Sequence, residues 1–156
     1  MGIFSFIKAA GKKIFGKKEE APAQAEAPQM SAEQAKLNAL QDEIKFMGIP
    51  VTNLSLGLGE AVTVSGVTPT NADREKIILT LGNVEGITAV TDNLVVTNPE
   101  PEAVFYTVVS GDTLSKISKA HYGDPMKYNQ IFEANKPMLK DVDEIYPGQV
   151  LRIPQA

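Results

Sequence analysis

The chain has 156 residues, enough for one medium domain or two small ones. Fifteen basic and nineteen acidic residues give a net charge of −4, which argues against a nucleic-acid partner, because neutralising phosphates takes a concentrated basic face. The absence of cysteine excludes disulfides, thiol nucleophiles and thiolate metal sites. The single histidine, His121, would have to serve any Ser-His-Asp triad.

The start of the chain is basic. Residues 1–18 hold five lysines and no acid, which leaves ten basic and nineteen acidic residues, a net of −9, in 19–156. Apolar residues at helical spacing predict a short amphipathic helix over 2–16, either as one helix or as two single turns interrupted at Gly11. Its apolar run stops at Lys8, too short for a signal peptide or a membrane span. We therefore expect a cytoplasmic chain without stable membrane insertion, with weak adsorption to a membrane surface as an alternative.

Residues 19–30 are rich in Ala, Pro, Gln and Glu, a composition typical of a linker. The next unit, 31–98, is expected to have the order αββαβ. A capping box at Ser31 opens its first helix. Alternating apolar residues over 51–65 predict a β-hairpin. Thr70 is expected to cap a second helix that ends at Gly82, and a last strand spans 87–96.

A short linker over 99–104 leads to a second unit, 105–155, with the expected order βααβ. Its first helix follows the Gly111-Asp112 turn, and Asp112 is expected to cap it. Asn135 ends the second helix, and Pro147-Gly148 turns the chain into the closing strand. The fold class is therefore α+β. Units this small have marginal cores, so contact between them is expected to stabilise both.

The second unit resembles a LysM domain over 105–154, in Tyr106-Thr-Val-Val-Ser-Gly-Asp-Thr-Leu-Ser-Lys-Ile-Ser and Ile145-Tyr-Pro-Gly-Gln-Val-Leu-Arg-Ile-Pro. The first unit looks like a BON domain over about 31–97, through Gly66 and Val84-Glu-Gly-Ile-Thr-Ala-Val-Thr-Asp-Asn-Leu-Val-Val. BON followed by LysM is similar to a family of small bacterial cytoplasmic potassium-binding proteins. The resemblance implies a monomeric, non-enzymatic potassium sensor or buffer in the stress response, with an unknown downstream protein partner.

Potassium suits several neutral carbonyl oxygens, which replace its water shell, whereas clustered carboxylates favour calcium or magnesium. Carbonyls lack helical partners at helix C-termini and carry negative partial charge there. Two such ends are expected, one at the break around Gly11 and one over Leu81–Ile87. They could enclose one ion or be two unrelated helix caps. In the first case the ion is expected to order the N-terminal turn and the BON domain. The carbonyl donors would be those of Ile7, Ala10, Lys12, Gly82, Val84 and Ile87.

The LysM resemblance also implies an alternative function, the binding of peptidoglycan (N-acetylglucosamine glycan) in the cell envelope. The groove residues would be Gly111, Asp112, Thr113, Leu114, Ile145, Tyr146 and Pro147. An enzyme is not expected. The acidic residues Asp141, Asp143 and Glu144 are typical of a solvated turn, and His121, at the end of a helix, is expected to have a structural role.

Overall fold

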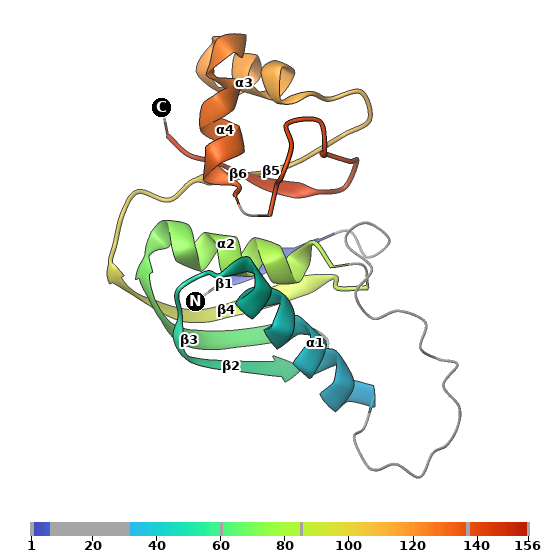
Figure 1. Ribbon diagram of the computed structural model, residues 1–156, viewed down its shortest axis with the longest axis vertical. Helices are drawn as coiled ribbons and strands as arrows, with labels where there is room; N and C mark the ends of the chain where they lie inside the picture. The colour runs from blue at the N-terminus through green and yellow to red at the C-terminus, as the bar shows by residue number, and fades with distance from the viewer. Residues whose placement is uncertain (1, 7–31, 60, 85, 137, 156) are drawn as a thin grey trace.

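A computed structural model describes residues 2–6, 32–59, 61–84, 86–136 and 138–155 (Figure 1). The first unit contains β1 (Gly2–Ser5), α1 (Ala32–Met47), β2 (Thr52–Leu58), β3 (Val62–Thr70), α2 (Asn71–Gly82) and β4 (Ala89–Asn98). The second contains β5 (Val104–Thr107), α3 (Leu114–Tyr122), the 3-10 turn η2 (Pro125–Lys127), α4 (Tyr128–Ala134) and β6 (Val150–Ile153). The predicted orders αββαβ and βααβ are both present, and the α+β class is confirmed.

The first unit is a four-stranded sheet with two helices on one face (Figure 1). The strand order is β1-β4-β3-β2. β2 and β3 form the predicted antiparallel hairpin, while β3 and β4 are parallel and joined by α2. Val64 and Val90 lie buried in one apolar cluster with Leu40 and Ile44 of α1 and Ile77 of α2. The helices therefore cover the face on which the valines alternate.

The expected N-terminal helix is wrong at its beginning. Residues 2–5 form β1, which pairs antiparallel with β4 and places Phe4 opposite Val90. The apolar residues fit a strand as well as a helix, because Phe4 and Phe6 fall on one side and Ile3 on the other. Ile3 is accordingly 70% exposed, whereas Phe6 is buried. The rest of the expected helix, the linker over 19–30 and Ser31 lie outside the described residues.

β3 is longer than predicted and runs past Gly66 to Thr70. Opposite Gly66, the register of β2 shifts between Thr52 and Ser55, which marks a β-bulge. Gly66 has φ +147°, and a Cβ there would lie 3.0 Å from the carbonyl oxygen of Thr52. Gly66 thus accommodates the bulge within a continuous strand.

Helix α2 confirms both predicted ends. The Thr70 hydroxyl accepts the backbone N–H of Asp73 at 3.2 Å, and the helix ends at Gly82. In the C-terminal unit, however, Thr113 and not Asp112 caps α3, by accepting the N–H of Lys116 at 3.1 Å. Asp112 does not cap the helix, because its carboxylate instead accepts the backbone N–H of Val109, on the β5 side of the turn.

The C-terminal unit rests on α2 through β6 (Figure 1). Val150 of β6 belongs to the apolar cluster of the first unit, and the ring of Phe105 lies 5.2 Å from that of Phe4. The second unit keeps a cluster of its own, around Ile117, Ile131 and other residues of α3, α4 and β6. The expected contact between the two small units is therefore present. Within the described part of the chain, none of the helices has the length and apolar character of a membrane span.

Candidate functional site

The C-terminal end of α2 contains three of the predicted site residues. Asn83 is the C-cap residue, and its backbone N–H donates to the carbonyl of Leu79 at 2.9 Å. After the helix, the N–H of Ile87 donates to the carbonyl of Val84 at 3.1 Å and closes a turn. Gly82, Val84 and Ile87 thus lie in one helix end and the loop that follows. Carbonyls here carry the negative end of the helix dipole.

The N-terminal segment docks on this helix end. The backbone N–H of Phe6 donates to the carbonyl of Thr88 at 2.7 Å, and the Phe6 side chain is 9% exposed. Its ring lies directly on Gly82, so that a Cβ at that position would overlap the ring. Glycine is therefore required here by a close approach. The other predicted site residues, Ile7, Ala10 and Lys12, lie outside the described residues, but the chain enters that segment from Phe6.

The side chain of Asn83 links this loop to the C-terminal unit. Its Nδ2 donates to the carbonyl of Val150 at 2.8 Å, and its Oδ1 accepts the N–H of Val150 at 2.9 Å. The amide thus satisfies both backbone groups of one β6 residue, as a neighbouring strand would. Sequence reasoning missed this contact. An Asn after a helix is a common cap, and nothing local indicates a partner 67 residues away.

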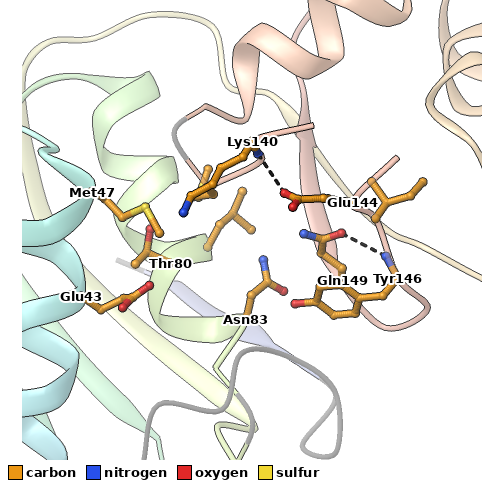
Figure 2. A pocket seen from close by; sticks show the side chains of 11 residues that line it. Glu43, Met47, Thr80, Asn83, Lys140, Glu144, Tyr146 and Gln149 are labelled. Atoms are coloured by element: carbon orange, nitrogen blue, oxygen red, sulfur yellow. Dashed lines mark hydrogen bonds between the residues drawn. The ribbon is translucent and has the colours of Figure 1, made fainter. Parts of the chain in front are cut away.

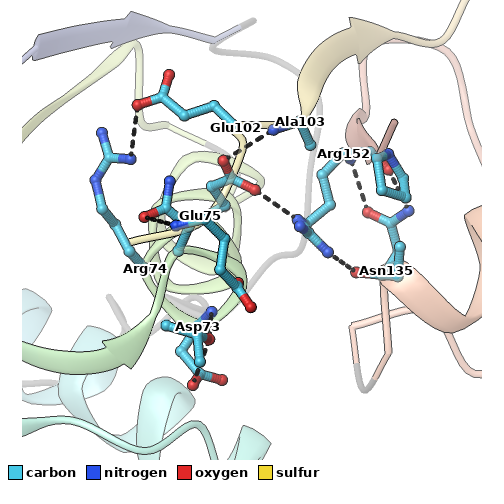
Figure 3. Close-up of polar contacts among 12 residues, drawn as sticks. Asp73, Arg74, Glu75, Glu102, Ala103, Asn135 and Arg152 are labelled. Carbon is cyan, nitrogen blue, oxygen red and sulfur yellow. Dashed lines mark hydrogen bonds and ion pairs between the residues drawn. The ribbon is translucent and has the colours of Figure 1, made fainter. Parts of the chain in front are cut away.

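A buried ion pair makes a second link, nearer the start of α2 (Figure 3). Arg152 Nε donates to Glu75 Oε1 at 2.9 Å, and the two side chains are 8% and 3% exposed. Glu75 Oε2 also accepts the backbone N–H of Ala103, in the segment between the units, at 3.1 Å. Arg152 Nη1 donates to the carbonyl of Ala134 at 3.0 Å. These bonds satisfy both charged groups, as burial requires.

The two loops of the predicted glycan groove lie at the same end of the β5–β6 pair. Gly148 N–H donates to the carbonyl of Val108 at 2.8 Å, and Val109 N–H donates to the Asp112 carboxylate at 2.9 Å. Leu114 is buried, and Ile145 packs on the same cluster. Gly111, Thr113 and Pro147 are exposed. The structure therefore brings the loops together.

Asp112 is the groove residue with the most hydrogen bonds. The Tyr106 hydroxyl donates to its Oδ2 at 2.6 Å. This hydrogen bond, together with the Val109 N–H, lowers the pKa of Asp112, and the same contact raises the pKa of Tyr106. The rings of His121 and Tyr106 pack in a T-shaped arrangement, with centroids 5.4 Å apart. Asp112 thus holds the turn between β5 and α3 in shape.

The acidic residues before Ile145 form a turn, as predicted. The Asp141 carbonyl accepts the N–H of Glu144 at 3.1 Å, and the Asp141 carboxylate accepts the N–H of Asp143 at 3.0 Å. All three residues are exposed. Across the described ranges, no three His, Cys, Asp or Glu side chains gather as a metal site would require.

Comparison with known proteins assigns the chain to a family over nearly its whole length. Residues 106–154 match the family model of the LysM domain. The chain is 44% identical over 158 residues to the potassium binding protein Kbp of Escherichia coli O6:H1, and the alignment covers 99% of each protein. An uncharacterized protein of Deinococcus radiodurans is 51% identical over 49 residues, which are 31% of this chain and 19% of that protein. The chain therefore belongs to the family of the potassium binding protein Kbp and carries a LysM domain at its C-terminal end.

Proposed function

We propose that this protein binds potassium ions in the cytoplasm, as a sensor or buffer and without catalysing a reaction. The observation that carries the proposal is the 44% identity to a protein named for potassium binding, over 99% of both chains. Likeness over the full length includes every segment that the ion would need, from the N-terminal residues to the loop after α2. A likeness confined to the LysM domain would not include them.

The ion would be held by backbone carbonyls of Gly82, Val84 and Ile87, together with those of Ile7, Ala10 and Lys12. The helix end supports this set of ligands, because its carbonyl oxygens have no formal charge but carry a negative partial charge. Such donors replace the water shell of potassium without the strong charge that would favour a divalent ion. The packing of Phe6 on Gly82 supports the pairing of the two segments, because it brings the chain to this loop one residue before Ile7.

Ion binding at such a junction would order the N-terminal turn and stabilise the first unit. A ligand that binds only the folded arrangement stabilises it by mass action, by about 2.7 kcal/mol at a hundredfold excess over Kd. We therefore expect a higher Tm in potassium chloride than in sodium chloride at matched ionic strength. Equal melting temperatures in the two salts would refute the proposal.

A substitution at Phe6 tests the location. Phe6→Ala removes the ring that seats the N-terminal segment on Gly82, so the potassium-dependent rise in Tm should shrink or vanish. The control is Phe46→Ala, which truncates an exposed ring on α1. If Phe6→Ala keeps the full potassium-dependent rise, the ion lies elsewhere.

Glycan binding is a second candidate, favoured by the LysM match and by the adjacency of the two groove loops. Cell fractionation and retention on peptidoglycan sacculi separate it from the first. Retention on sacculi that falls when Thr113 is changed to Tyr would support it. Recovery in the cytosol without retention on sacculi would leave potassium binding as the better account.

A further inference from the structure

A pocket of about 470 Å³ lies between the two units (Figure 2). Helices α1 and α2 form one side, and the segment that leads into β6 forms the other. Its volume lies within the range of small-molecule sites, which are often found between domains. Three half-buried side chains, Met47, Met138 and Ile145, line the pocket and leave part of their surface open. Together they form an apolar wall to which both units contribute.

The amide of Gln149 is held with its donor end toward the pocket. Gln149 is only 7% exposed, and its Oε1 accepts the backbone N–H of Tyr146 at 3.3 Å. This bond keeps Oε1 on the protein side, and Nε2 turns toward the pocket (Figure 2). No residue that the structure describes accepts the Nε2 protons. Among the described residues, every fully enclosed side-chain nitrogen or oxygen has a hydrogen bond, so Nε2 is a donor that is reached through the pocket.

The hydroxyl of Tyr146 is a second donor. It points across the pocket toward Asn83 (Figure 2), and none of the residues in the described ranges forms a hydrogen bond with it. Burial raises the pKa of Tyr146 to about 12, so the hydroxyl stays protonated at neutral pH and can donate. The Gln149 N–H also donates to the Tyr146 carbonyl at 3.1 Å. One turn of the backbone therefore carries both donors.

Asn83 lines the pocket across from these donors. Its two bonds to Val150 use one Nδ2 proton and one Oδ1 lone pair, so the side-chain amide retains a second proton and a second lone pair. Asn83, Gln149 and protonated Tyr146 are all neutral. A ligand that brings a full charge to them loses hydration without gaining an opposite charge. The three side chains therefore suit a neutral ligand that has both an acceptor and a donor.

We propose that the pocket between the units binds a neutral molecule that carries an amide group on an apolar body. The amide carbonyl receives the protons of Gln149 Nε2 and the Tyr146 hydroxyl, and the amide N–H donates to Asn83 Oδ1. The body packs on the apolar wall, where the flexible methionines adapt to apolar groups of different shape. The ligand is distinct from the potassium ion, for which backbone carbonyls of the neighbouring loop are proposed.

The test is an NMR titration of the full-length, ¹⁵N-labelled protein, at constant potassium concentration, with benzamide, acetophenone and benzoate, which have nearly the same shape. Benzamide should shift the side-chain amide signals of Gln149 and Asn83. Acetophenone lacks the N–H donor and should bind about threefold to tenfold more weakly, as expected for one hydrogen bond. Benzoate should also bind more weakly, because its charge has to leave water. Thymidine and cyclo(Leu-Leu) carry the amide in a nucleobase and in a cyclic dipeptide, and the lower Kd identifies the source that fits better.

Two variants with matched controls locate the binding. Tyr146→Phe removes a hydroxyl that no described residue bonds, so the fold should persist while benzamide binding weakens about threefold to tenfold. Gln149→Glu keeps an acceptor for the Tyr146 N–H but replaces the donor with an oxygen, and should weaken binding at least about tenfold. Tyr128→Phe and Gln130→Glu make the same changes on α4, outside the pocket, and should leave Kd unchanged. Unchanged Tm values would establish that each variant is folded.

Four results would overturn the proposal. Equal binding of benzamide and acetophenone would remove the role of the amide N–H. Tighter binding of benzoate than of benzamide would show that the site prefers a charged ligand. Unchanged Kd values in both pocket variants would place the ligand elsewhere. Signals of Gln149 that respond to N-acetylglucosamine oligomers but not to benzamide would assign the pocket to a glycan. None of these results depends on whether potassium binds as proposed.

Discussion

The two ends of α2 are joined to the C-terminal unit by different chemistry. Near its start, Glu75 and Arg152 form a buried pair of full charges. At its end, Asn83 holds Val150 with a neutral amide. Removing one partner of a buried ion pair strongly destabilises the fold, because the other charge stays buried with neither its partner nor water beside it. A neutral amide brings no formal charge near the carbonyls of Gly82 and Val84.

This difference bears directly on the proposed ion loop. The amide of Asn83 adds no formal charge beside these carbonyls, whereas a carboxylate in its place would attract divalent cations. The charged contact, Glu75 with Arg152, lies at the other end of the helix. The helix thus separates the buried ion pair from the loop proposed for the potassium ion. Three substitutions test the contacts along α2, and a fourth tests a charged hydrogen bond elsewhere for comparison.

The largest effect is expected from Glu75→Ala. It leaves the Arg152 guanidinium buried without its partner, which typically costs about 3–5 kcal/mol. Urea unfolding should show the loss as a lower midpoint. The matched control is Glu133→Ala, which breaks an exposed pair with Lys136 and should cost under about 1 kcal/mol. Similar losses for the two variants would show that the buried pair contributes little.

Asn83→Ala should have the next largest effect. It removes two hydrogen bonds and leaves the N–H and carbonyl of buried Val150 without partners, at about 1–3 kcal/mol for each group. Asn129→Ala, at an exposed position of α4, serves as the control. Hydrogen exchange at the Val150 amide should accelerate in Asn83→Ala and not in the control. Unchanged exchange would mean that water or another group replaces the amide.

Gly82→Ala tests the seat of the N-terminal segment. The added Cβ would overlap the Phe6 ring, and overpacking of this kind costs about 1–3 kcal/mol. Combining Gly82→Ala with Phe6→Ala should cost less than the sum of the two single changes, because the clash disappears with the ring. Strict additivity, measured by thermal unfolding, would contradict the contact.

The smallest effect concerns a charged hydrogen bond away from α2. Tyr106→Phe removes the donor that, more than any other group, lowers the pKa of Asp112. A carboxyl group whose pKa is lower in the folded state stabilises the fold at pH values above its unfolded-state pKa. This stabilisation is lost as the pH falls through the folded-state pKa. The Tm difference between parent and variant should therefore shrink below about pH 4. A Tm difference that stays constant down to low pH would show that the hydrogen bond does not stabilise the fold through the charged form of Asp112.

Local signals predicted much of the fold. Thr70 and Gly82 mark the ends of α2, because caps and helix ends depend on neighbouring residues. The sequence does not distinguish strand β1 from a helix, because four residues satisfy both periodicities and pairing with β4 decides between them. Asp112 was expected to cap α3 because the preference for Asp at that position ignores the competing donors of Tyr106 and Val109.

The candidate site was less predictable. Gly82, Val84 and Ile87 follow from the expected helix end, since any helix C-terminus presents carbonyls. The packing of Phe6 on Gly82 joins residues 76 positions apart and leaves no trace in local composition. Glu75 and Arg152 each look like surface charges in the sequence, and only the fold buries them together. Contacts of this kind depend on tertiary structure.

The bulge opposite Gly66 has a consequence for solubility. β2 lies at the edge of the sheet, and a regular edge strand offers its unpaired backbone to other molecules as a template for aggregation. The register shift between Thr52 and Ser55 interrupts that template, and Asn53, at φ +55°, turns the backbone there out of strand geometry. Because only glycine fits opposite the bulge, Gly66 indirectly protects concentrated protein from edge-to-edge association.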